Sequence, residues 1–183
     1  TKYCAIPIYI TKQGDWITGG ANFTDPKSYK DLDKLIASGK KIIFPTSPEE
    51  QRIMHTPGAF AFGSLFTDKI DVAFPCFHGK YGEDGSVQGF FELANIPYVG
   101  CNVQASAIGM NKYLSKKLAA NLGINTTKDF FVKLSDWEAH KNNLLKQVNS
   151  ELKYPLYIKP VHLGSSIGIS RVSKKSELED ALE

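Results

Sequence analysis

A histidine, two carboxylates and four glycines occur together in residues 78–89, which read HGKYGEDGSVQG. His78 follows an apolar run, and an imidazole can pass a proton near neutral pH to a carboxylate or an acyl phosphate. Glu83 and Asp84 stand where a following helix would begin, and carboxylates are common at that position for structural reasons. This segment can therefore be a reaction site or an ordinary loop before a helix.

The turn from Lys159 to Gly168 is a second candidate, because a lysine at the end of an expected strand precedes small, hydroxyl-bearing residues. Gly164, Ser165 and Ser166 are small enough for their backbone N–H groups to approach phosphate oxygens. The lysine precedes the turn, unlike that of a Walker loop, and the turn does not open a helix as a dinucleotide fingerprint does. Taken alone, a plain hairpin explains this turn equally well.

Lys112 is the third candidate, at the start of a helix predicted from an apolar stripe of Leu114, Leu118 and Leu122. A cation at a helix N-terminus is disfavoured by the helix dipole unless an anion lies nearby. This position hints at a phosphate ligand, although a solvated surface lysine is the simpler explanation from position alone.

Composition indicates a soluble globular protein of one moderate or two small domains. The 183 residues are 42% hydrophobic and 22% charged, with a net charge of +3. The scattered lysines do not indicate a nucleic-acid surface, and no segment approaches the roughly 20 apolar residues that span a bilayer. We therefore expect neither nucleic acid nor membrane as a partner.

The three cysteines, Cys4, Cys76 and Cys101, are far apart and odd in number. This spacing argues against a disulfide framework and a zinc site, and it fits a reducing cytosol. We expect all three to be buried thiols.

The N-terminal half predicts an α/β fold. Expected strands are 3–10, 41–45, 71–77 and 97–99, and expected helices are 29–37 and 87–94; residues 46–69 are ambiguous, with a possible strand or hairpin at 59–65. The apolar run 71–77 is typical of a parallel strand buried on both faces. The strand–loop–helix–strand order predicts an open sheet with ligand sites at the carboxyl ends of its strands, where His78 lies.

The C-terminal half changes character after a boundary near residues 103–109. Expected elements are a helix over 112–122 ending at Gly123, a strand at 129–132, a helix over 135–152 with a Ser135–Glu138 capping box, strands at 156–159 and 167–172, and a last helix capped by Ser176 and Glu179. No internal repeat is evident.

Four blocks of the sequence together resemble the D-alanine–D-alanine ligases, bacterial ATP-grasp enzymes that make the dipeptide end of the peptidoglycan stem. The blocks are 78–89, 97–101, 105–112 and 154–170, and they occur in the family's order and spacing. The resemblance covers the chain from about residue 3 to its end. It implies an incomplete pre-ATP-grasp (Rossmann-like) parallel-sheet domain at 1–105, followed by the small α+β ATP-grasp subdomain at 106–183.

The resemblance also assigns a nucleotide site. Lys112 and Lys159 match the lysines that bind ATP phosphates. Gly164, Ser165 and Ser166 match the glycine-rich loop that folds over the γ-phosphate.

The resemblance implies a substrate site as well. His78 matches a histidine next to the carboxylate of the first D-alanine, and Glu83 supports that region. Ser165 matches a serine of the hydrogen-bonded group near the same substrate, so Ser165 and His78 are the implied catalytic residues. The implied reaction forms an acyl phosphate from D-alanine and ATP, and the amine of a second D-alanine then displaces the phosphate.

The family's cofactor and setting follow by resemblance: Mg²⁺ with ATP, a cytoplasmic location and a homodimer formed through the N-terminal domain. This chain offers no match to the family's metal ligands, its first strand and helix, or its C-terminal lobe. We therefore expect a piece of a longer protein, with little or no ligase activity by itself.

Three alternatives stay open. The parent protein can be a D-alanine–D-lactate or D-alanine–D-serine ligase, because the residues that select the second substrate are not among those matched. It can also be a more distant ATP-grasp carboxylate–amine ligase. From a different class, the chain can be a nucleotide-binding or interaction module without catalysis.

Overall fold

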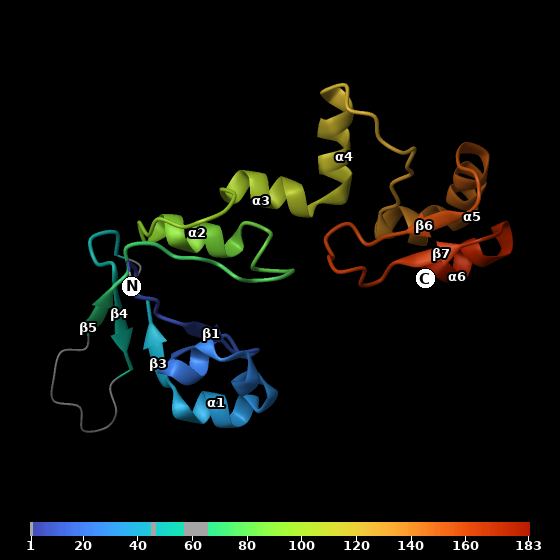
Figure 1. Cartoon of the computed structure of the whole chain (residues 1–183). Helices are drawn as coiled ribbons and strands as arrows, with labels where there is room; N and C mark the ends of the chain where they lie inside the picture. The colour runs from blue at the N-terminus through green and yellow to red at the C-terminus, as the bar shows by residue number, and fades with distance from the viewer. Residues whose placement is uncertain (1, 45–46, 57–65) are drawn as a thin grey trace. The chain divides into compact units, whose positions relative to one another are not determined.

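The computed structural model describes residues 2–44, 47–56 and 66–183 (Figure 1). Two compact units are present. Unit 1 comprises Thr1–Phe74 and Phe90–Val99, and unit 2 comprises Pro75–Gly89 and Gly100–Glu183. The predicted hairpin at 59–65 lies outside the described residues.

Unit 1 contains a five-stranded sheet in the order β1-β2-β3-β4-β5. The strands are β1 (Ile8–Ile10), β2 (Trp16–Thr18), β3 (Lys40–Ile43), β4 (Arg52–His55) and β5 (Phe66–Lys69). Every neighbouring pair is antiparallel, with Tyr9 opposite Ile17 and Ile17 opposite Lys41. The predicted strand at 41–45 is confirmed over residues 41–43; Phe44 follows the strand, and residue 45 lies outside the described residues. Only the end of the predicted strand 3–10 is extended in the sheet.

Short helices connect β2 to β3 and complete the core of unit 1. They are two 3-10 turns, Ala21–Thr24 and Pro26–Lys30, and helix α1 (Leu32–Ser38). The helix predicted over 29–37 starts later because the carboxylate of Asp31 caps it by accepting a hydrogen bond from the Lys34 N–H at 3.1 Å.

The core of this unit explains the glycine that follows α1. Ile17, Phe23 and Leu35 are buried in one cluster. A Cβ at Gly39 would lie 2.4 Å from the side chain of Ile17 and 2.6 Å from that of Phe23. Gly39 therefore lets the chain leave α1 close against this core.

The prediction of a buried parallel strand at 71–77 is wrong. Parallel pairing is limited to one bridge, in which the Ala73 N–H donates to Pro97 O at 2.8 Å and the Val99 N–H donates to Ala73 O at 3.0 Å. Val72 and Phe74 are 54% and 73% exposed. A strand buried on both faces needs other elements packed on each face, and in the described structure Val72 and Phe74 lack that cover.

Three helices follow the His78 loop along the chain: α2 (Ser86–Leu93), α3 (Val103–Met110) and α4 (Lys112–Asn121). The predicted face of α2 is confirmed at Val87, Phe91 and Ala94, which are buried. Helix α4 is also confirmed and ends before Gly123, whose φ of +76° is left-handed. Its leucine stripe, by contrast, is exposed.

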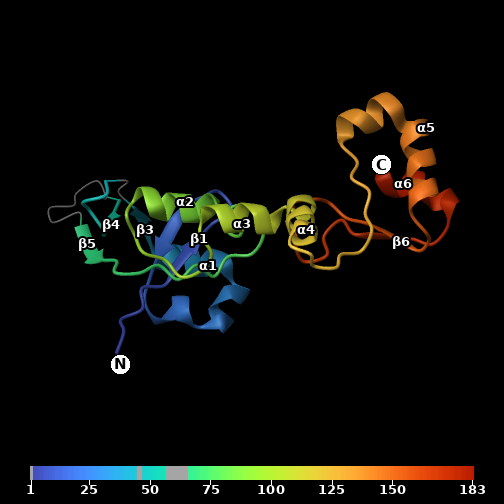
Figure 2. The ribbon, with the colours of Figure 1, turned by 90° about the horizontal axis from the view of Figure 1, so that it is seen from above.

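The C-terminal part of unit 2 is a hairpin packed with two helices (Figures 1 and 2). Strands β6 (Leu156–Ile158) and β7 (Ser170–Val172) pair in antiparallel register, and they pack with α5 (Leu134–Glu151) and α6 (Leu178–Leu182). One buried residue from each element forms the core: Val148, Leu156, Val172 and Leu178. The predicted hairpin and both helices are confirmed here.

Two predicted helix caps are wrong. Helix α5 begins at Leu134, so Ser135 lies within its first turn and its hydroxyl donates to Asp136 instead of capping the helix. A 3-10 turn, Lys175–Glu177, contains Ser176 and precedes α6. The pattern of a serine followed three residues later by a glutamate therefore predicted where each helix lies in the chain, but not the residue at which the helix begins.

The strand predicted at 129–132 is also absent. Phe131 instead stacks on Tyr113 of α4, with ring centroids 4.3 Å apart and planes inclined by 22°. Aromatic stacking within unit 2 takes the place of strand pairing for this segment.

The prediction of buried thiols is wrong, because Cys4, Cys76 and Cys101 are free and exposed.

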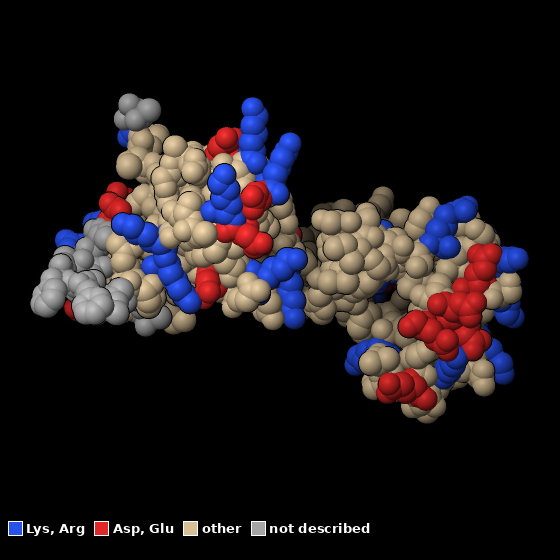
Figure 3. Space-filling model, turned by 90° about the horizontal axis from the view of Figure 1, so that it is seen from below, with Lys and Arg blue, Asp and Glu red and all other residues tan. Residues whose placement is uncertain are grey.

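Positive and negative side chains lie side by side on the face seen in Figure 3, as the small net charge leads one to expect. None of the helices in the described ranges is long and apolar enough to cross a bilayer.

Replacing Leu178 by alanine tests the core of unit 2. Leu178 has no exposed surface, so Leu178→Ala removes buried methyl groups and leaves a cavity. We expect the free energy of unfolding to fall by about 3 kcal/mol, measured by urea denaturation. Leu134→Ala, at a leucine that is 72% exposed, is the matched control and should change stability by less than about 0.5 kcal/mol. Equal effects of the two substitutions would contradict this assignment of the core.

Candidate functional site

The turn between β6 and β7 uses its carbonyl groups for its own structure and leaves N–H groups unpaired. Gly164 O accepts from the Ile167 N–H at 3.0 Å, and Ser166 O accepts from the Ile169 N–H at 3.3 Å. The N–H groups of Gly164, Ser165 and Ser166 donate to no atom of the described residues. Three consecutive donors are therefore available to an external acceptor.

The backbone of this turn is left-handed at three positions. Ser165 and Ser166 have φ of 52° and 60°, and Gly168 has φ of 69°. Left-handed conformations are uncommon for residues other than glycine, and such strain occurs preferentially at functional sites. A Cβ at Gly168 would also lie 2.7 Å from Cγ of Pro160, so this glycine is required by both conformation and space.

The first residues of α4 hold the turn from outside. The Lys112 N–H donates to Val161 O at 3.1 Å, and the Lys112 ammonium donates to Leu163 O. Next to them, Nδ2 of Asn111 lies 3.1 Å from Nε2 of His162. The Lys112 ammonium thus has a hydrogen-bond acceptor in the turn. This hydrogen bond offsets the unfavourable interaction of a cation with the N-terminal end of the helix dipole.

This arrangement is suited to binding an anion. An ammonium has three donors, and Leu163 O uses one of those of Lys112. Lys159 lies exposed at the start of the same turn. Together with the unpaired N–H groups, these cations offer the charge and the donors that phosphate oxygens need.

The His78 loop is built differently, with carboxylates accepting from its backbone. Glu83 accepts from the Gly79 N–H. Asp84 accepts from the N–H groups of Tyr81 at 2.8 Å and Ser86 at 3.0 Å. Both carboxylates precede α2 instead of lying in its first turn as predicted, because the helix begins only at Ser86.

These hydrogen bonds change the titration of Asp84. Partial burial acts to raise the pKa of its carboxyl, but donors from the backbone of Tyr81 and from Ser86 outweigh it and hold the pKa below its usual value. The buried side chain of Gln88 supports the same loop by donating to Gly82 O at 3.0 Å.

The structure brings some of the predicted site residues together and not others. Lys112 contacts the turn that carries Gly164, Ser165 and Ser166. His78 is exposed, and no described contact links it or Glu83 to that turn. Asn111 and His162 were not predicted as site residues, although an asparagine directly before a helix is a readable cap signal.

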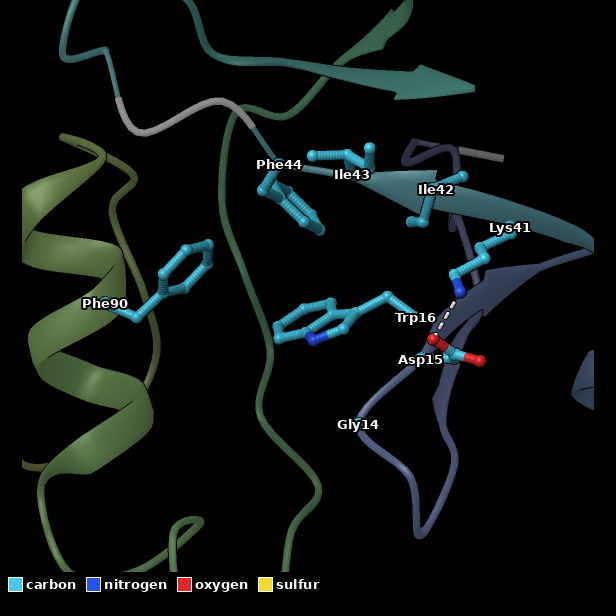
Figure 4. Close-up of a pocket in the computed structure, with 8 residues that line it drawn as sticks. All are labelled: Gly14, Asp15, Trp16, Lys41, Ile42, Ile43, Phe44 and Phe90. Carbon is cyan, nitrogen blue, oxygen red and sulfur yellow. Dashed lines mark ion pairs between the residues drawn. The ribbon is translucent and has the colours of Figure 1, made fainter. Parts of the chain in front are cut away.

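A cavity of about 330 Å³ lies in unit 1, and no predicted site residue lines it (Figure 4). The rings of Trp16, Phe44 and Phe90 point toward one another, with centroids 5.1 to 5.9 Å apart. Its polar edge is an ion pair between Lys41 and Asp15 at 2.5 Å. Among the described residues that line the cavity, Lys41 and Asp15 are the charged ones, and they pair with each other.

The described part of the chain contains no cluster of metal-ligating side chains. Throughout residues 2–44, 47–56 and 66–183, no three His, Cys, Asp or Glu side chains lie close enough together to hold a metal ion.

Family profiles match most of the chain. Residues 1–101 match the family described as "D-ala D-ala ligase N-terminus", and residues 118–183 match "D-ala D-ala ligase C-terminus". The D-alanine–D-alanine ligase of Chlorobium phaeovibrioides is 41% identical over 98% of this chain. That of Bacillus pumilus is 39% identical over all of it. In each case the chain spans about half the length of the curated relative, 48%.

Solved structures agree with these matches. The VanG D-Ala:D-Ser ligase of Enterococcus faecalis has a TM-score of 0.78 and 34% identity, and the D-alanine–D-alanine ligase of Coxiella burnetii has 0.76 and 28%. The match to the VanG ligase includes 99% of this chain and 49% of that structure's chain. The match to the Coxiella burnetii ligase includes 96% of this chain and 48% of that structure's chain.

The fold and the sequence matches thus relate this chain to ligases, a class of enzymes. More closely, the chain belongs to the D-alanine–D-alanine ligase family.

Replacing Asp84 by asparagine tests the His78 loop. The substituted amide would keep one acceptor oxygen but place its NH₂ group against a backbone N–H. We expect Asp84→Asn to lower the free energy of unfolding by about 1 kcal/mol at pH 7. Because the folded pKa of Asp84 lies below its unfolded value of about 3.9, this stabilisation is complete above that value and is lost as the pH falls through the folded pKa.

The measurement is urea unfolding of both proteins from pH 7 to pH 3, in which the two curves should converge at low pH. Asp71→Asn, at a side chain that is 86% exposed, serves as the control. A stability difference that stayed constant down to pH 3 would show that the carboxylate of Asp84 is not the stabilising group.

Proposed function

We propose that the protein to which this chain belongs joins two D-alanine molecules at the expense of ATP, for peptidoglycan precursor synthesis. The carboxylate of the first D-alanine attacks the γ-phosphate, and an acyl phosphate and ADP form. The amine of the second D-alanine then attacks the acyl carbon, and phosphate leaves. One observation carries the proposal: the unpaired N–H groups of 164–166 lie in a turn held by Lys112.

In this proposal the turn and its lysines bind the phosphates of ATP. Lys112 and Lys159 neutralise charge on the phosphate oxygens, and Gly164, Ser165 and Ser166 donate their N–H groups to them. Donors fixed before substrate arrives need no reorganisation during the reaction, which is the main source of catalysis in such transfers.

The first D-alanine is assigned to His78, Glu83 and Ser165. His78 would donate to the carboxylate of this substrate, and its exposure leaves the imidazole accessible. Glu83 holds the loop by accepting from Gly79. Ser165 would hydrogen-bond near the reacting carboxylate, so His78 and Ser165 are the proposed catalytic residues.

The remaining parts of the proposal follow from the family. ATP-grasp ligases use Mg²⁺, which would neutralise phosphate charge when bound, and no residue of this chain is assigned as its ligand. Residues 1–105 would be the pre-ATP-grasp domain and 106–183 the small ATP-grasp subdomain. A cytoplasmic homodimer is the proposed state of the full-length protein.

A second candidate function is D-alanine–D-serine ligation. It is favoured by the likeness to the VanG D-Ala:D-Ser ligase, with 34% identity and a TM-score of 0.78. The two candidates share the first substrate and the phosphate site. Comparing kcat/KM for D-alanine and D-serine as the second substrate distinguishes them.

Replacing Lys159 by alanine in the full-length protein tests the phosphate site. The substitution removes a cation from the turn, and a hydrogen bond to a charged group is worth about 1.5 to 3 kcal/mol. We expect the KM for ATP to rise by roughly tenfold to a hundredfold, measured as phosphate release with D-alanine and ATP.

Lys153→Ala provides the matched control, because Lys153 is an exposed lysine that precedes β6. It should leave the KM for ATP unchanged. If Lys159→Ala matched the control in both ATP affinity and turnover, the phosphate site would be wrongly placed.

A further inference from the structure

One contact at the turn has no role in the function described so far. Nδ2 of Asn111 lies 3.1 Å from Nε2 of His162, directly beside the bonds from Lys112 to Val161 O and Leu163 O. Two consecutive residues at the start of α4 thus hold three consecutive residues of the turn. His162 is two residues before Gly164, whose N–H group has no partner among the described residues.

The geometry fixes which of the two side chains donates. Oδ1 of Asn111 accepts from the Leu114 N–H at 2.9 Å and so caps α4. The side-chain amide therefore turns Nδ2, which can only donate, toward His162. Nε2 of His162 has to accept, which requires a neutral imidazole with its proton on Nδ1.

A protonated imidazole cannot make this contact. It would present an N–H at Nε2 to the N–H groups of Asn111, and the hydrogen bond would be lost. The charged group that faces the turn from α4 is the Lys112 ammonium, and Lys159 is the charged group on the turn itself. Both are cations, so neither offers a protonated His162 an alternative acceptor.

We propose that His162 is a positioning residue for the ATP site. In its neutral form, His162 accepts a hydrogen bond from Asn111 and so ties the phosphate-binding turn to the start of α4. The tie keeps the N–H groups of Ser165 and Ser166 on the same phosphate as the Lys112 ammonium. His162 itself touches no substrate. This inference rests on the proposed function, because it concerns the same phosphate site.

The test compares substitutions of His162 in the full-length protein. His162→Ala removes the acceptor, and we expect the KM for ATP to rise by about fivefold, the effect of one ordinary hydrogen bond, with kcat nearly unchanged. His162→Gln places Oε1 near the position of Nε2 and should restore the wild-type KM. His140→Ala, at another exposed histidine of unit 2, should have no effect.

The pH dependence separates this tie from general support of the fold. In the wild type, the KM for ATP should rise as the pH falls, because a protonated His162 cannot accept from Asn111, and in His162→Gln that pH step should be absent. Asn111→Asp keeps the cap on α4 but replaces the donor by an acceptor. It should therefore abolish the step, because both protonated His162 and the neutral tautomer with its proton on Nε2 can donate to the new carboxylate.

Failure of this inference can be told from failure of the proposed function. If Lys159→Ala weakens ATP binding but His162→Ala does not, or if His162→Gln is as impaired as His162→Ala, the positioning role is overturned. An unchanged pH step in Asn111→Asp also overturns it. If Lys159→Ala has no effect either, the phosphate site itself is misplaced.

Discussion

A turn that binds phosphate has to leave its own N–H groups unpaired, so it must be held by its carbonyl groups and by neighbouring elements. The turn between β6 and β7 meets this constraint. Gly164 O and Ser166 O accept from residues further along the turn, and Val161 O and Leu163 O accept from Lys112. The N–H groups of residues 164–166 stay free because every fixing bond is made elsewhere.

The rest of unit 2 supplies the rigid base for this turn. Both strands that carry it bury a residue in the core formed by Val148, Leu156, Val172 and Leu178. The His78 loop is fixed through its N–H groups instead of its carbonyl groups. The carboxylates of Glu83 and Asp84 accept hydrogen bonds from these backbone N–H groups. Backbone and side-chain hydrogen bonds together hold both candidate loops in place.

The sequence predicted elements best where the pattern is local. Helix α4, with Gly123 after it, and the β6–β7 hairpin were found from periodicity and turn residues. The run 71–77 was misread because burial on two faces depends on partners that the run itself does not encode, and in the described structure Phe74 is 73% exposed. The contact between Asn111 and His162 joins residues 51 apart, so only the fold could reveal it. Lys112 and Lys159, by contrast, were candidates from their positions in the sequence, and the family resemblance gave them their role.

The claim that the unpaired turn binds phosphate is tested most directly by NMR on the chain of 183 residues. Inorganic tripolyphosphate would be added to ¹⁵N-labelled protein while the backbone amide signals are followed. The structure predicts saturable shifts concentrated at Gly164, Ser165 and Ser166, whose amides have no partner among the described residues. Shifts confined to surface lysines elsewhere, with these three amides unmoved, would contradict it.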